Sequence, residues 1–83
     1  MARKEPRVVA SEVVTIMERY LQRQSHLQRG DAVEVLAERA EMSTRTVYRI
    51  LEGNRKWLDL DQADRLLIAA GFHLSDVTVE SRT

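Results

Sequence analysis

The stretch LAERAEMSTRTVYRILEG, residues 36–53, decides how this chain folds. Its apolar residues recur at steps of three and four, the spacing that places side chains on one face of a helix. The pattern predicts two short helices, at about residues 32–40 and 44–52, joined by about three residues. Such a tight junction needs a small residue at the helix contact, an apolar residue in the turn and a β-branched anchor, and the predicted motif core is Leu36, Ala37, Ala40, Met42, Val47 and Ile50.

Residues that begin and end helices extend this pattern outward. Short polar side chains precede four apolar stripes, and we predict as helix N-caps Ser11, Asp31, Ser43 and Asp59. The first helix would run from Ser11 to about Gln28, unless Ser25 and His26 interrupt it. Each glycine follows a stretch of helical periodicity, where the left-handed conformation of a C′ residue favours this residue type, at Gly30, Gly53 and Gly71. These signals predict an all-α fold, a small bundle of four to five short helices.

The length and composition limit the domain organisation. A chain of 83 residues forms one small domain. We assign residues 1–10 to a flexible basic N-terminal arm, 11–77 to the helical domain and 78–83 to a C-terminal tail or the start of a linker. The absence of cysteine excludes disulfides and thiolate metal sites. The longest apolar run, Leu66 to Ala70, is far shorter than the roughly 20 residues of a membrane span, so we expect a cytoplasmic protein.

The charge distribution is polarised although the formal net charge is zero, with 13 basic and 13 acidic residues. Residues 1–29 and 44–58 each carry a net charge of +3, whereas residues 30–43 and 59–83 each carry −3. One basic segment therefore coincides with the second helix of the motif and the loop after it. Such a molecule can bind a polyanion without carrying a net positive charge.

Residues 36–53 resemble the helix-turn-helix DNA-binding domains of phage repressors of the Cro and lambda-repressor type, and their second helix is similar to that of LacI-type regulators. The segment WLDLDQADRLLIAAG, residues 57–71, resembles the fourth helix of such domains. Members of this class usually carry glycine in the turn, where this chain has Glu41. A left-handed residue other than glycine costs about 1 kcal/mol, which the fold can tolerate.

The resemblance implies that the second helix enters the major groove of DNA. We therefore expect base contacts from Thr44, Arg45 and Arg49. The two arginines are four residues apart, so they project from one helical face, opposite the apolar stripe. The arginine fork matches O6 and N7 of guanine. Hydroxyl groups and the loop after the helix would hold phosphates, and we expect these contacts from Ser43, Thr46, Tyr48, Asn54, Arg55 and Lys56.

The predicted function is sequence-specific binding of a double-stranded DNA operator by a transcriptional repressor similar to phage or prophage immunity repressors. One alternative is a protein–protein interaction module or antitoxin-like partner binder, and another is an excisionase-like accessory factor. A homodimer and an additional C-terminal domain both stay open as partners. The N-terminal arm is either disordered or a clamp on the minor groove or phosphates.

No residue pattern indicates an enzyme or a cofactor. The sequence has no phosphate-binding glycine motif and no catalytic triad, so we expect neither a catalytic residue nor a small-molecule substrate. His26 and His73 stand alone, which argues against a metal site. We interpret the acidic residues Asp59, Asp61 and Asp64 as capping a helix and complementing its dipole, and not as a metal site. We interpret Trp57 as a cover for the edge of the core.

Overall fold

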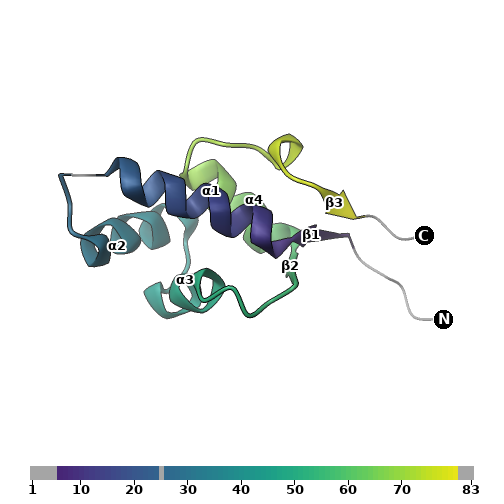
Figure 1. The fold of residues 1–83 in the computed structure, drawn as a ribbon, viewed down its shortest axis with the longest axis horizontal. Helices are drawn as coiled ribbons and strands as arrows, with labels where there is room; N and C mark the ends of the chain where they lie inside the picture. The colour runs from purple at the N-terminus through teal and green to yellow at the C-terminus, as the bar shows by residue number, and fades with distance from the viewer. Residues whose placement is uncertain (1–5, 25, 81–83) are drawn as a thin grey trace.

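The helices and strands follow one another along the chain as Figure 1 shows. The computed structural model describes residues 6–24 and 26–80. The helices are α1 (Ala10–Arg23), α2 (Arg29–Ala40), α3 (Thr44–Leu51) and α4 (Leu60–Ala69), with a short 3₁₀ helix η1 (Leu74–Asp76). The strands are β1 (Arg7–Val9), β2 (Trp57–Asp59) and β3 (Val79–Glu80). Within these described residues, none of the helices combines the length and the apolar character that crossing a membrane requires.

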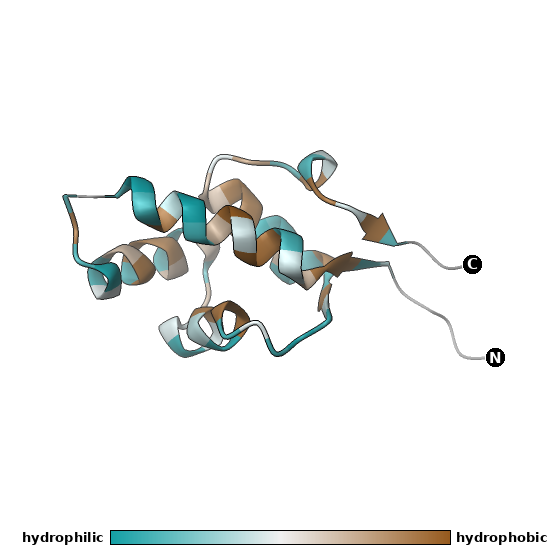
Figure 2. Ribbon diagram, viewed as in Figure 1, coloured by the Kyte–Doolittle hydropathy of each residue, from teal (hydrophilic) through white to brown (hydrophobic). Residues whose placement is uncertain are grey.

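Each of the four α-helices turns one apolar stripe toward a common core. Figure 2 shows the helices as alternating bands of hydrophilic and hydrophobic residues, as expected for helices with one buried face. Five of the six predicted motif-core residues are buried, and Met42 is half-buried against the same core. The largest fully buried side chains are Met17, Leu36, Ile50, Leu58, Leu66 and Leu67. The helical part of the predicted fold is confirmed.

A small antiparallel sheet corrects the prediction of an all-α fold. The strand order is β2-β1-β3, at one end of the helical bundle (Figure 1). Val8 of β1 pairs with Leu58 of β2, and both side chains are buried in the core. The fold is therefore mostly helical with a three-stranded sheet. Because the strands are only two or three residues long, they carry too few alternating positions to be recognised from the sequence.

The sheet also changes the assignment of both ends of the chain. Residues 7–10, predicted as part of a flexible arm, form the central strand and the first residue of α1. Val79 and Glu80, predicted as tail or linker, form the strand β3 beside it. Residues 1–5 of the predicted arm and residues 81–83 lie outside the described residues.

Two of the four predicted N-caps are confirmed, and two are wrong. Ser43 and Asp59 each accept a hydrogen bond from a backbone N–H in the first turn of the helix that follows. In contrast, α1 begins at Ala10, one residue before Ser11, and the Ala10 N–H bonds to the carbonyl of Lys56 at 3.1 Å. The sheet thus leads directly into α1, so the helix begins without a side-chain cap.

The start of α2 differs from the prediction in a similar way. This helix begins at Arg29, so Asp31 lies in its first turn and does not cap it. Gly30 lies within the helix rather than after one, and α1 ends at Arg23 instead of extending to about residue 28. Gly53 and Gly71 have φ angles of +76° and +87°, which confirms the left-handed turns predicted there.

Candidate nucleic-acid interface

A three-residue turn, residues 41–43, joins α2 to α3. Glu41 has the left-handed backbone that the turn requires, with φ 57° and ψ 44°. Its N–H bonds to the carbonyl of Glu38 at 3.1 Å, and the N–H of Met42 bonds to the carbonyl of Ala37 at 2.9 Å. This pair of bonds forms a Schellman motif, in which the half-buried Met42 supplies the usual apolar contact. The bonds offset the cost of about 1 kcal/mol for a left-handed glutamate.

The first turn of α3 is held by two hydroxyl groups. The Oγ of Ser43 accepts a hydrogen bond from the Thr46 N–H at 3.1 Å and lies 2.9 Å from Thr46 Oγ1. Both residues were predicted to contact phosphate. In the free protein their hydroxyls bond to each other, and because each hydroxyl has further hydrogen-bonding capacity, this geometry still permits a phosphate contact.

The two sides of α3 differ sharply in character. Val47 and Ile50 are buried against the rest of the domain. The opposite side carries the three residues predicted to contact bases, Thr44, Arg45 and Arg49, and all three are exposed. Among residues 6–24 and 26–80, neither arginine forms an ion pair with a carboxylate. Both guanidinium groups are thus available to an external ligand.

Tyr48 lies on the same exposed side of α3, between the predicted base-contact residues. Its side chain is 43% exposed. The ring extends toward the start of α2, because a Cβ atom added at Gly30 would lie only 3.9 Å from Tyr48 Oη. The hydroxyl can therefore donate to a ligand that bridges the beginning of α2 and the exposed side of α3.

Next to Tyr48, an ion pair joins α1 to the start of α2. The two guanidinium nitrogens of Arg29 donate to the two carboxylate oxygens of Glu18 at 2.8 and 3.0 Å. The hydrogen bond from Arg29 lowers the pKa of Glu18, and the bond to Glu18 raises the pKa of Arg29. The positive charge at this edge of the interface is therefore already balanced, unlike that of Arg45 and Arg49.

The loop after α3 presents the other residues predicted to contact phosphate, and all of them are exposed. Asn54 donates to Glu52 at 3.3 Å. Arg55 donates to the side-chain oxygen of Gln62 in α4, also at 3.3 Å. The sequence did not predict this contact between Gln62 and the loop, because it depends on how α4 packs. Both hydrogen bonds are exposed to water. Arg55 can therefore exchange its bond to Gln62 for a bond to a ligand.

Trp57 follows this loop and belongs to a cluster that the sequence did not predict. The guanidinium carbon of Arg7 lies 3.9 Å from the centre of the Trp57 ring, and Arg7 also donates to Glu80 at 2.9 and 3.3 Å. Trp57 is half-buried, but it is not one of the partly buried residues that pack against the core, so its role as a cover for the core edge stays a prediction. Arg7 is partly exposed and is held by these contacts, so it belongs to the sheet and not to a disordered arm.

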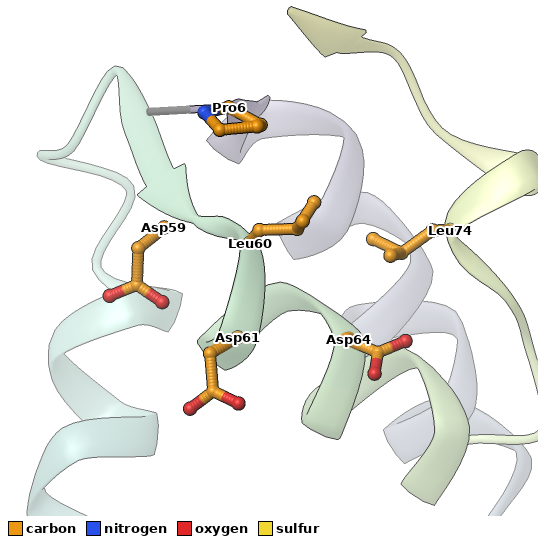
Figure 3. Close-up of a pocket in the computed structure, with 6 residues that line it drawn as sticks. All are labelled: Pro6, Asp59, Leu60, Asp61, Asp64 and Leu74. Carbon is orange, nitrogen blue, oxygen red and sulfur yellow. The ribbon is translucent and has the colours of Figure 1, made fainter. Parts of the chain in front are cut away.

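An open pocket of about 570 Å³ lies at the start of α4 (Figure 3). Leu60 and Leu74 extend toward each other across it. Three aspartates line its rim, of which Asp59 caps α4 and Asp61 pairs with Arg65 at 3.2 Å. No group of three or more histidine or acidic side chains in the described ranges is arranged to hold a metal ion.

Comparisons of the chain with protein-family models, with curated proteins and with solved structures found no match. The functional interpretation of these residues therefore rests on their geometry, exposure and charge.

Proposed function

We propose that this chain binds double-stranded DNA sequence-specifically, with α3 in the major groove, as the DNA-binding domain of a transcriptional repressor. The observation that supports this most strongly is the pair Arg45 and Arg49 on the exposed side of α3. Both are exposed and without a carboxylate partner among the described residues, whereas Val47 and Ile50 fix the opposite side of the helix in the core. A rigid helix that presents free arginine forks is suited to reading base edges.

The dimensions and chemistry of α3 suit the major groove. The groove is about 12 Å wide, and a helix with its side chains has a diameter of roughly 10–12 Å. In this arrangement each arginine donates two hydrogen bonds to O6 and N7 of a guanine. The methyl group of Thr44 packs against a thymine methyl, or its hydroxyl bonds to a base edge. Ser43 caps the start of α3. In the proposed complex the first residues of this helix, Thr44 and Arg45, enter the groove.

Phosphate contacts then fix the orientation of the helix. Tyr48 and the hydroxyls of Ser43 and Thr46 lie at the side and beginning of α3, and Arg55 and Lys56 follow its end. These groups would contact the backbone on both sides of the groove, which determines register without reading sequence. With only two loop cations on phosphates, binding to random DNA is weak and its salt slope is about −2.

Repression follows from occupancy of the operator, because a protein bound in the groove of a promoter excludes polymerase. The proposed context is cytoplasmic regulation of the type found in phage and prophage immunity, which rests on the resemblance of residues 36–53. Either of the alternatives from the sequence, a protein-binding module or an excisionase-like factor, would make different use of this surface. A protein-binding module in particular has no need of Arg45 and Arg49.

The test begins with selection of bound duplexes from a random library, followed by affinity measurements on the selected site. Arg45→Ala and Arg49→Ala should each weaken binding to that site by about 5-fold to 150-fold, the loss of one bidentate base contact. Arg39→Ala is the matched control, because Arg39 is an exposed arginine of α2 without an ion pair in the described residues. Equal losses on selected and random DNA would contradict base reading, and a wild-type chain that selects no sequence would refute the function.

A further inference from the structure

The cluster of Arg7, Trp57 and Glu80 links the two ends of the fold to the loop that precedes Trp57. Arg7 lies in β1, Trp57 in β2 and Glu80 in β3, so each strand of the sheet contributes one member. Arg7 is directly opposite Glu80 in the register of β1 and β3. Its guanidinium lies against the Trp57 ring at 3.9 Å while it bonds to Glu80. One side chain therefore bridges the two outer strands across the central one.

The same contacts determine where the end of the loop lies. Lys56 immediately precedes Trp57, and its carbonyl accepts a hydrogen bond from Ala10 N–H at 3.1 Å. Its ammonium group lies 5.9 Å from the centre of the Trp57 ring, within the range of a cation–π interaction. The backbone of Lys56 is thus held by the first residue of α1, and its side chain lies near the Trp57 ring of the sheet. Among the described residues, no hydrogen bond joins Lys56 to α3.

The strand β3 is fixed in turn by contacts that reach back into α1. The N–H of Thr78 donates to a carboxylate oxygen of Glu12 at 2.7 Å, and the N–H of Val9 donates to the carbonyl of Thr78 at 3.3 Å. These bonds align β3 so that Glu80 meets Arg7. Because the side chains of Arg7 and Glu80 are 35% and 34% exposed, water shields the pair only partly.

We propose that Arg7 and Glu80 are positioning residues for the DNA-contacting loop, acting through Trp57 to place the ammonium group of Lys56. This inference rests on the proposed function. It extends that function by making the strand β3 part of the DNA-binding unit. Glu80 carries a negative charge and touches no DNA, yet it favours DNA binding. A bystander carboxylate would instead repel the phosphates.

The first test asks whether a substitution of Glu80 weakens or strengthens DNA binding. The quantity measured is the affinity for a random-sequence duplex at low salt. Glu80→Gln removes one negative charge, so simple electrostatics predicts tighter binding, whereas loss of positioning weakens it by about threefold to tenfold. Asp61→Asn is the matched control, because it makes the same charge change in another arginine pair and should bind equally or more tightly. If Glu80→Gln binds as tightly as the wild type, or more tightly, the proposal is wrong.

A second test uses the free protein and does not depend on DNA. Trp57 is the only tryptophan in the chain, so its fluorescence reports on this cluster alone. Arg7→Ala uncovers the ring and should shift its emission to longer wavelength, and Arg7→Lys should restore most of the wild-type emission and DNA affinity. An unchanged emission in Arg7→Ala would show that the arginine does not cover the ring.

The two tests also separate this inference from the function on which it rests. A wild-type chain that binds no duplex overturns both, even when the fluorescence shows the cluster to be formed. A wild-type chain that binds, together with a Glu80→Gln variant that binds equally well, overturns the positioning role alone. Circular dichroism at the temperature of the binding measurements shows whether each variant is folded. If Glu80→Gln is not folded, Arg7→Ala serves as the second variant, because it should weaken binding where Arg7→Lys does not.

Discussion

The cap at the start of α3 allows a quantitative test, because the chain contains a second serine near a helix start that does not act as a cap. Ser43 Oγ accepts the Thr46 N–H at 3.1 Å, whereas Ser11 lies inside α1, after Ala10. Ser43→Ala leaves one N–H of the first turn without its side-chain partner. Since Ser43 is exposed, water replaces part of the lost bond, and we expect a loss of about 1 kcal/mol in the free energy of unfolding.

This loss corresponds to a decrease of about 4–8 °C in the melting temperature of a domain of this size. Ser11→Ala should leave the stability unchanged or raise it by about 0.5 kcal/mol, because alanine has the higher helix propensity. Urea and thermal unfolding followed by circular dichroism measure both variants. Equal destabilisation by the two substitutions would mean that α1 begins at Ser11, and a neutral Ser43→Ala would mean that the cap is not formed in solution.

A third variant separates the structural role of Ser43 from its proposed DNA contact. Ser43→Asp keeps an N-cap acceptor and adds a negative charge at the positive end of the helix dipole, so the stability should be retained. The same charge faces the phosphates in the proposed complex, so DNA binding should weaken. An aspartate variant that retains both stability and DNA affinity would remove Ser43 from the interface.

Three further predictions concern the core, a turn and an ion pair. Leu66→Ala should lower the unfolding free energy by about 2–5 kcal/mol because Leu66 is fully buried, whereas Ile68→Ala, at a position 58% exposed, should change it little in the same urea titration. Gly53→Ala should cost about 1 kcal/mol through its φ of +76°, since nothing lies within 4 Å of the added methyl group; a neutral result would mean that this turn rearranges. The pKa of Glu18 is lowered by Arg29, so the stabilisation by this pair is present above the unfolded-state pKa and is lost as the pH falls through the folded-state pKa. The difference in unfolding free energy between wild type and Glu18→Gln should therefore shrink as the pH falls below the ordinary glutamate pKa of about 4.3, and a difference that is constant with pH would contradict the pair.

The helices could be predicted from the sequence because their signals are local. The stripe of Leu36, Ala37 and Ala40 has the helical period, and Ser43 stands next to the helix that it caps. The exposure of Arg45 and Arg49 follows from the same periodicity, because a helix whose apolar side is buried must turn the opposite side to solvent. This part of the candidate site required no knowledge of the tertiary structure.

The sheet and the residues that it places could not be predicted in this way. The sequence around Val8 has no local signal of a strand. Val8 belongs to a strand only because it pairs with Leu58, which lies far along the chain. The same long separation hides the contact of Arg7 with Glu80. The incorrect cap at Ser11 has the same origin: Ser11 is a suitable cap, but α1 begins one residue earlier, where the Ala10 N–H bonds to the carbonyl of the distant Lys56.

Pairing of β1 with β3 also has a kinetic consequence. Arg7 and Glu80 are 73 residues apart, so their contact closes a loop containing almost the whole chain. Loop-closure entropy must be overcome before such a contact contributes stability, whereas the helices and the turn between α2 and α3 need only neighbouring residues. We therefore expect the helices to form before the sheet during folding. In the native state the two-residue strand β3 should open most readily, with amide protons that exchange faster than those of α4.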